Sequence, residues 1–178
     1  MKFKIFRFKK VNSTNNTAIR IIRNSNLNYG MVISEMQNNG RGQYGKKWIS
    51  YKGNLFASFF HPFDQNKFSI ERATKLNCNL VKKLLSKYVK NEITFKKPND
   101  LLVNKEKISG ILQEIITKSD KKFLITGIGI NVIKNPNIKN YPATNLHTIT
   151  GKKINKSELE NNLKLVFENR ISKMYKKN

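Results

Sequence analysis

Apolar and polar residues recur along the chain with periods that predict both strands and helices. Residues 2–8 alternate apolar and basic side chains, and residues 30–35 and 54–60 are short apolar runs, so all three predict strands. Residues 68–89 carry apolar side chains at helical spacing. Ser13-Thr14-Asn15 supplies capping side chains before a further, isoleucine-rich helix.

The second half of the chain continues the mixture. Residues 93–96 predict a strand, followed by a turn at Pro98-Asn99-Asp100. Three more strands are predicted: 101–103 and 108–116, paired about a turn at 104–106, and 123–133, which is buried and contains two glycines. Residues 157–160 (SELE) form a capping box before a last helix. Strands grouped centrally and flanked by helices predict an α+β (α/β) fold with a mixed sheet.

Length and composition limit the class of protein. A chain of 178 residues with 38% apolar residues is sufficient for one domain with a real core. Its apolar runs are far shorter than the roughly 20 residues that cross a bilayer, so we expect no membrane association. Cys78 is the only cysteine, which excludes an intrachain disulfide and predicts a cytoplasmic protein. The helical pattern places Cys78 on a partly buried flank.

The formal net charge of +24 points at first to a nucleic-acid partner. Lysine, asparagine and isoleucine are abundant, however, and all three have A/T-rich codons, so genome composition accounts for much of the charge. The lysines are also spread along the chain rather than gathered in one block. We therefore interpret the charge as a solvated basic surface with weak, non-specific affinity for polyanions.

Residues 40–48 (GRGQYGKKW), called the glycine loop below, fit the dinucleotide-binding pattern G-x-G-x-x-G. That interpretation fails because residues 46–53 have no amphipathic helical period, and no Walker motif is present either. Two interpretations remain: a flexible basic loop without a ligand, or a loop that closes over an anionic ligand. In the second, the glycines admit close backbone approach, Arg41 offers a planar fork to oxygen anions, and Trp48 offers a flat face to a ring.

Other positions supply complementary chemistry, although each has an ordinary structural alternative. Ser13, Thr14 and Gln37 suit an uncharged, amide-like ligand, but Ser13 and Thr14 are commonly helix caps. Lys107 precedes Gly110 on a predicted strand, where it would reach a carboxylate or phosphate, yet it is one of many lysines. Asp100 would help hold magnesium or orient an amine, or simply complete a turn, and Asn131 would satisfy backbone groups.

Together and in order, these stretches resemble the biotin protein ligases. The resemblance covers roughly residues 11–151, and the ordered set is far more specific than any one piece. The matching pieces are Ser13-Thr14-Asn15, Glu35-Met36-Gln37, the glycine loop, Gly53-Asn54-Leu55, 96–101 (KKPNDL), 107–112 (KISGIL), 127–131 (GIGIN), 141–146 (YPATNL) and Thr150-Gly151. The resemblance implies a class II synthetase-like biotin/lipoate ligase catalytic domain, with a mixed, largely antiparallel sheet flanked by helices.

The resemblance also implies a reaction and its participants. ATP, with magnesium, converts biotin to biotinyl-5′-AMP, and a lysine of a biotin carboxyl carrier protein of acetyl-CoA carboxylase then takes the biotin. The implied catalytic residues are Arg41, Lys107 and Asp100, with Asp100 near the magnesium or the incoming lysine. The implied biotin contacts are Ser13, Thr14, Asn15, Gln37, Arg41, Gly42, Gln43, Lys107 and Gly110. The implied nucleotide contacts are Arg41, Trp48, Lys107 and Asn131.

The chain departs from the family pattern in three ways. Gln43, Tyr44 and Lys46 stand where many relatives have arginine, which leaves fewer forks for phosphate, and Lys97 stands where tryptophan is usual. We expect residues 1–178 to be a single catalytic domain, without the N-terminal DNA-binding domain or the C-terminal SH3-like barrel of longer relatives. A repressor role and a specific nucleic-acid partner are accordingly not expected, while a homodimer is left open.

Two alternative functions remain. A lipoate or octanoate ligase shares the fold class, although Ser13, Thr14 and Gln37 suit the ureido group of biotin better than an acyl chain. A basic nucleic-acid-binding module would use the positive charge, with Trp48 and Tyr44 stacking on bases. Such a module would bind RNA in a salt-dependent way and would ignore biotin.

Overall fold

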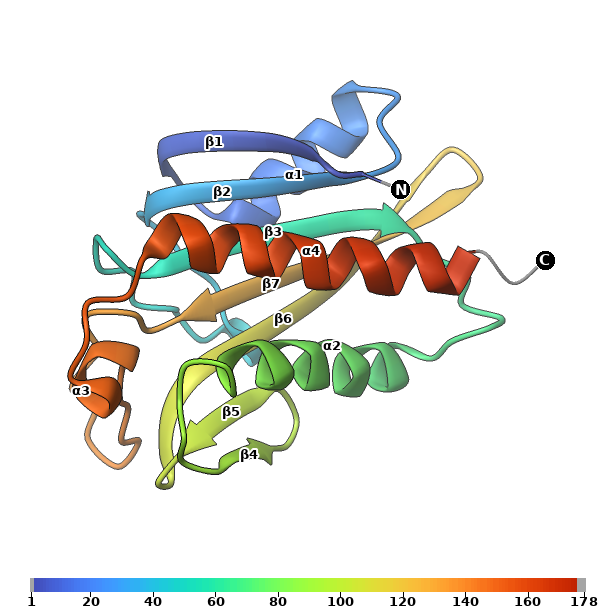
Figure 1. The fold of residues 1–178 in the computed structure, drawn as a ribbon. Helices are drawn as coiled ribbons and strands as arrows, with labels where there is room; N and C mark the ends of the chain where they lie inside the picture. Colours follow the sequence, from blue (N-terminus) through green and yellow to red (C-terminus); the bar gives the residue numbers. More distant parts are fainter. Residues whose placement is uncertain (1, 176–178) are drawn as a thin grey trace.

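The chain forms one seven-stranded sheet with helices on both faces (Figure 1). The computed structural model describes residues 2–175. Neighbouring strands follow the order β1-β2-β3-β7-β6-β5-β4, in which β1 and β2 are parallel and every other neighbouring pair is antiparallel. The strands are β1 (Lys4–Val11), β2 (Gly30–Gln37), β3 (Leu55–Pro62), β4 (Ile93–Lys96), β5 (Asp100–Val103), β6 (Glu106–Lys118) and β7 (Lys121–Ile130). The predicted mixed, largely antiparallel α+β fold is confirmed.

The helices divide between the two faces of the sheet. In Figure 1, α2 (Ile70–Leu85) and α4 (Lys156–Tyr175) cross in front of the sheet, and α1 (Thr14–Asn24) lies behind it. The short helix α3 (Leu146–Thr150) follows β7, and one 3₁₀ turn, Gln43–Gly45, lies within the glycine loop. Within residues 2–175, no helix combines the length and the apolar character needed to cross a membrane.

The larger core lies between the sheet and helices α2 and α4. Its centre is a stack of Phe59 from β3 on Phe167 from α4, with ring centroids 4.2 Å apart and nearly parallel planes. Phe3 packs against Phe59 at 5.1 Å. Side chains alternate across a strand, so Phe59 faces this core while Ser58 and Phe60 point to the opposite face.

The opposite face of the sheet carries a smaller apolar core at one end and glycines at the other. Ala18 and Ile22 of α1 pack on Phe60 and Ile125. Further along β7, Gly127 and Gly129 follow Ile125 at alternate positions and therefore lie on the same face. Helix α1 begins beside Gly127, where an added Cβ would lie 2.3 Å from Asn15 Oδ1. Past the start of α1, this face of β7 carries glycine, so another segment can pack close to its backbone.

Several local predictions need correction. The capping residue of α4 is Asn155, whose Oδ1 accepts from the Glu158 N–H (3.2 Å), so Ser157 lies inside the helix and the predicted capping box is wrong. Asp100 begins β5, and the turn consists of residues 97–99. Helix α3 was not predicted, because five residues are too few to show a helical period.

Two side chains, Ser13 and Cys78, also differ from expectation. Ser13 occupies the N-cap position of α1, but its side chain makes no capping hydrogen bond. Cys78 is fully buried rather than partly buried. Burial raises the pKa of the Cys78 thiol to about 12, so this thiol is neutral and unreactive in the folded protein at physiological pH.

The aromatic stack predicts a strong stability effect. Phe167→Ala should lower the free energy of unfolding by about 3–5 kcal/mol, because it leaves a cavity against Phe59. Leu165→Ala, on the exposed side of the same helix, should change it by less than about 0.5 kcal/mol. Urea denaturation followed by circular dichroism compares the two, and equal effects would contradict this packing.

His61 in β3 predicts a pH dependence of stability. Burial lowers the pKa of His61 from 6.5 to about 4, against the opposing effect of its hydrogen bond to the Pro62 carbonyl. Well above pH 6.5, His61 is neutral in both the folded and the unfolded protein. As pH falls from 6.5 to 4, only the unfolded state gains this proton, so folding should lose up to about 3 kcal/mol from this group. Urea denaturation at stepped pH should show a shallower loss in His61→Asn, and identical profiles would contradict the assignment.

Candidate active site

A cavity of about 500 Å³ lies on the same face of the sheet as α1, beside the first residues of that helix. Its walls come from the start of α1, the end of β2, the glycine loop, the turn at 97–99, and strands β6 and β7. Nearly all of the sequence-predicted site residues line it: Ser13, Thr14, Asn15, Gln37, Arg41, Gly42, Gln43, Trp48, Asp100, Lys107 and Gly110. Asn131 is the exception, since it lies behind the wall.

The floor of the cavity is built from paired glycines. Gly110 of β6 lies opposite Gly129 of β7 in the antiparallel register. The indole of Trp48 lies directly against both, because an added Cβ would approach it to 2.6 Å at Gly110 and 2.5 Å at Gly129. A larger residue at either position would push the ring away. The indole therefore lies against Gly110, one of the residues that the resemblance assigned to biotin.

The glycine loop folds back on itself above this floor. The backbone N–H of Trp48 donates to the Gly40 carbonyl at 2.8 Å, and the backbone N–H of Gly42 donates to the Lys46 carbonyl at 2.6 Å. At the tip, Tyr44 and Gly45 have positive φ angles of 55° and 73°, and the Tyr44 side chain is 87% exposed. The loop is thus a small hairpin that presents Arg41 and Trp48 to the cavity.

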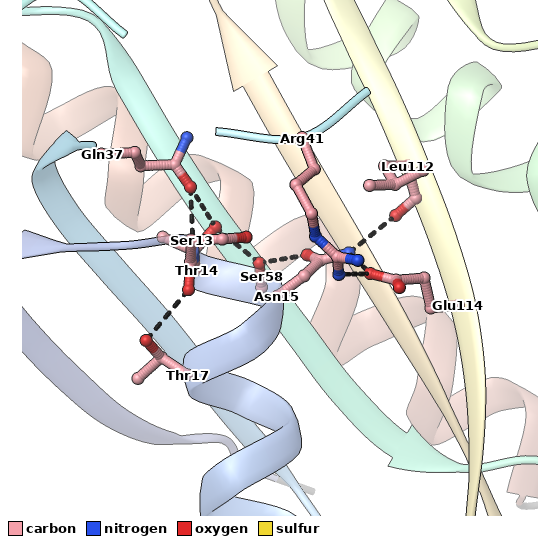
Figure 2. Close-up of polar contacts among 9 residues, drawn as sticks. All are labelled: Ser13, Thr14, Asn15, Thr17, Gln37, Arg41, Ser58, Leu112 and Glu114. Atoms are coloured by element: carbon pink, nitrogen blue, oxygen red, sulfur yellow. Dashed lines mark hydrogen bonds and ion pairs between the residues drawn. The ribbon is translucent and has the colours of Figure 1, made fainter. Parts of the chain in front are cut away.

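One end of the cavity is lined by neutral hydrogen-bonding groups. Gln37 Oε1 accepts from the backbone N–H of Thr14 (2.8 Å) and from its hydroxyl (3.1 Å), so Gln37 rather than Ser13 satisfies the start of α1 (Figure 2). Gln37 Nε2 donates to Ser50 Oγ at 3.1 Å. The Ser58 hydroxyl lies 2.7 Å from Thr14 Oγ1 and 2.5 Å from Asn15 Oδ1. We call this the polar end.

Glu114 of β6 lies beside the polar end, outside the lining of the cavity, and was not predicted. It accepts from Asn15 Nδ2 at 2.7 Å and forms an ion pair with Arg41 of the glycine loop (Figure 2). A signal was available: Gly110 and Glu114 lie on the same face of the predicted strand by alternation. The pairing with Arg41, 73 residues away in the chain, is not visible in any local pattern.

The other end of the cavity is charged. Lys107 Nζ lies 2.7 Å from Asp100 Oδ1, and the Tyr141 hydroxyl donates to Asp100 Oδ2. Burial, together with Asp100, raises the pKa of Tyr141, so the phenol stays a donor. The Lys107 ammonium also lies 5.1 Å from the Trp48 ring and 5.4 Å from the Tyr141 ring. Tyr141 belongs to a segment that resembles the family, but the sequence indicated no role for it.

Asn131 supports the charged end from behind. Its side chain is only 2% exposed, and its Nδ2 donates to the backbone carbonyls of Thr144 (3.0 Å) and Lys107 (3.3 Å). These bonds hold the segment after residue 140 against the start of β6. In this structure Asn131 therefore fixes the backbone that carries Lys107.

The charge of the wall favours an anionic ligand. Six cationic side chains line the cavity: Arg41, Lys46, Lys47, Lys96, Lys97 and Lys107. Asp100 is the only acidic residue among the lining residues. Glu114 neutralises Arg41 and Asp100 pairs with Lys107, which leaves four lysines to set the sign of the potential near the opening.

A resident metal site does not fit these residues. Among residues 2–175 no three histidine, cysteine, aspartate or glutamate side chains gather where they could hold a metal ion. Asp100, the predicted candidate for magnesium, has one oxygen bound by Lys107 and the other by Tyr141. Its carboxylate thus already has an ion pair at Oδ1 and a hydrogen bond at Oδ2, although Oδ1 accepts no hydrogen bond among residues 2–175.

The known proteins with similar sequences include bifunctional ligase/repressor proteins of bacteria. The chain is 30% identical over 168 residues to the "Bifunctional ligase/repressor BirA" of Bacillus subtilis, which covers 90% of this chain and 51% of that protein. It is 32% identical over 102 residues to the BirA of Escherichia coli, covering 56% and 32% of the two chains. The chain thus spans about half the length of the Bacillus relatives that it matches.

Solved structures and a family model agree with this likeness. A biotin protein ligase from Aquifex aeolicus, in complex with biotin and ATP, superposes with a TM-score of 0.78 at 28% identity, covering 98% of this chain and 73% of that one. The model of the Biotin/lipoate A/B protein ligase family matches residues 7–131, which include both ends of the cavity except Tyr141. This chain therefore belongs to the biotin/lipoate A/B protein ligase family.

Proposed function

We propose that the protein is an ATP-dependent biotin ligase, which activates biotin as biotinyl-5′-AMP and transfers it to a protein lysine. One observation carries the proposal. The polar end and the cationic Lys107 end lie on a single glycine floor, within one cavity of about 500 Å³. A ligand with a neutral hydrogen-bonding head and a carboxylate tail matches that arrangement. The complex of the Aquifex ligase with biotin and ATP supports the choice by analogy.

The polar end suits the ureido group of biotin. A cyclic urea has one strong acceptor and two N–H donors, and burying it requires partners for each of them. Ser13 Oγ makes no capping bond, and Thr14, Asn15 and Gln37 line the same cavity with a hydroxyl and two amides. Leu112, on the cavity face of β6, adds apolar wall for the ring and chain of the ligand. Lipoate has no ureido group and would form fewer hydrogen bonds with these hydroxyls and amides than biotin, which disfavours the lipoate ligase alternative.

The charged end suits the activation step. A biotin carboxylate oxygen attacks the α-phosphorus of ATP, a new P–O bond forms, and pyrophosphate leaves with the electrons of the broken α–β bond. Two anions must approach each other for this to occur. The Lys107 ammonium, held by Asp100 and partly shielded from water, is the cation best placed to neutralise them. Lys46, Lys47, Lys96 and Lys97 extend the positive wall toward the triphosphate.

Magnesium enters this proposal as part of the substrate. Mg²⁺ commonly binds through phosphate oxygens and water with few protein ligands. Since both oxygens of Asp100 are already bound, the ion would arrive on ATP and leave on pyrophosphate. No protein ligand needs to be assigned to it.

The second step uses a partner protein. The amine of an acceptor lysine attacks the biotinyl carbonyl, a C–N bond forms, and the bond to the phosphate oxygen breaks to release AMP and a proton. The acceptor in this proposal is a lysine of a biotin carboxyl carrier protein in the cytoplasm. The alternative of a nucleic-acid module is disfavoured because the Trp48 ring packs on the glycine floor inside the cavity and does not stand out from the surface as a stacking platform.

Calorimetry separates the three functions. Titration with biotin should give saturable binding, and ATP should then bind to the biotin complex. Lipoate should bind at least about tenfold more weakly, because it lacks the ureido group that would hydrogen-bond to the polar end. Tight binding of a defined RNA with no heat from biotin would instead favour the nucleic-acid module, and preference for lipoate would favour the other ligase.

Substitution of Lys107 tests the activation step. Lys107→Ala should lower biotin-dependent exchange of pyrophosphate into ATP by about 100-fold or more, since it removes the cation from the charged end. Lys121→Ala, which removes an exposed lysine at the start of β7, should leave the exchange near the wild-type rate. Near-normal exchange in Lys107→Ala would refute this role for the residue.

A further inference from the structure

We propose that Glu114 is a positioning residue, which fastens the glycine loop across the polar end through Arg41 and orients the side chain of Asn15. Its effect on ligand retention rests on the proposed function, whereas its effect on the loop does not. The family resemblance assigned Arg41 to ligand anions and assigned nothing to Glu114.

The position of Glu114 follows from the register of the sheet. On β6, Gly110, Leu112 and Glu114 occupy one face, opposite Gly129, Gly127 and Ile125 of β7. Glu114 therefore stands at the edge of the glycine floor, where α1 begins to cover the sheet. Its side chain is 25% exposed, and it meets Asn15 of α1 on one side and Arg41 of the loop on the other.

Arg41 reaches the polar end and not the charged end. Lys107 Nζ lies 3.3 Å from the position of an added Cβ at Gly110, so the ammonium lies above that glycine. Glu114 comes four residues later on the same strand, roughly 13 Å away. The ion pair with Glu114 thus holds the Arg41 guanidinium far from the cation that would face the carboxylate. Arg41 joins the loop to the sheet at one end of the cavity, while Trp48 covers the floor at the middle.

Glu114 also determines which way the Asn15 amide points. A carboxylate only accepts hydrogen bonds, and the Leu112 carbonyl beside it is also an acceptor, so the Asn15 Nδ2 donor faces both. Asn15 Oδ1 then faces Ser58, whose hydroxyl donates to it. One carboxylate therefore orders the amide and the hydroxyls of the polar end. A neutral amide in its place could donate as well as accept, and would not impose this order.

Limited proteolysis tests the fastening without any ligand. Lys46 and Lys47 lie in the loop, so trypsin should cut after them faster when the loop is released. Glu114→Gln should raise this cleavage rate at least about fivefold, and Arg41→Gln should do the same. Glu106→Gln removes a carboxylate from the same strand that forms no ion pair among residues 2–175, and should leave the rate unchanged. Mass spectrometry identifies the fragments.

A charge exchange distinguishes fastening from general destabilisation. The double variant Arg41→Glu with Glu114→Arg restores an ion pair between the same positions, so cleavage after Lys46 and Lys47 should return toward the wild-type rate. Thermal unfolding of each variant shows whether the fold is intact. Equal cleavage rates in wild-type, Glu114→Gln and Arg41→Gln proteins would overturn the proposal, as would a double variant cut as fast as the single ones.

Biotin dissociation tests the consequence for the ligand. In stopped-flow experiments the dissociation rate of biotin should rise about tenfold in Glu114→Gln, while exchange at saturating biotin and ATP should fall by less than about threefold. An unchanged dissociation rate would overturn the role in retention. Absence of biotin binding in the wild-type protein would instead refute the proposed function, and the proteolysis result would still decide whether Glu114 fastens the loop.

Discussion

The antiparallel pairing of β6 with β7 places Gly110 opposite Gly129, and the rest of the site depends on that register. Two glycines side by side remove every side chain from a patch of the sheet, which lets the Trp48 indole lie against the backbone. A shift by one residue would turn Ile111 and Ile128 onto this face and close the cavity. The same register places Glu114 beside α1 and Lys107 at the opposite end.

Each end of the cavity combines a cation with a carboxylate of the chain. Lys107 and Asp100 lie within the wall, where partial burial strengthens their attraction and Tyr141 satisfies the second oxygen of the carboxylate. Arg41 and Glu114 are more exposed and connect a loop to a strand. The first pair suits a fixed electrostatic environment for reacting anions. The Arg41–Glu114 pair suits a loop that opens and closes, because water readily solvates both charges of an exposed pair when it separates.

Sequence reasoning named most of the residues of interest that line the cavity, because they occur in short, ordered motifs. Periodicity placed the strands and long helices, and the order of motifs indicated the family. It missed Glu114 and Tyr141, whose importance comes from distant partners. It also placed the cap of α4 at Ser157, two residues after the true cap, Asn155. It assigned Asn131 to a ligand, and the structure adds that Asn131 Nδ2 donates to two backbone carbonyls while its Oδ1 has no hydrogen-bond partner among residues 2–175. A polar side chain in a sequence does not show whether its partner is a ligand or the protein itself.

By itself, the sequence determined the fold class, the order of the strands and helices along the chain, and the set of residues near the cavity, since these follow from hydrophobic period and from motif order. Only the tertiary structure decided how those residues pair. It directs Arg41 to Glu114 and Lys107 to Asp100, and it lets Gln37 cap a helix that begins 23 residues earlier in the chain. The physical reason is that hydrogen bonds and ion pairs act over a few ångströms, and only the folding of strands, loops and helices against one another brings residues that are far apart in sequence within that range.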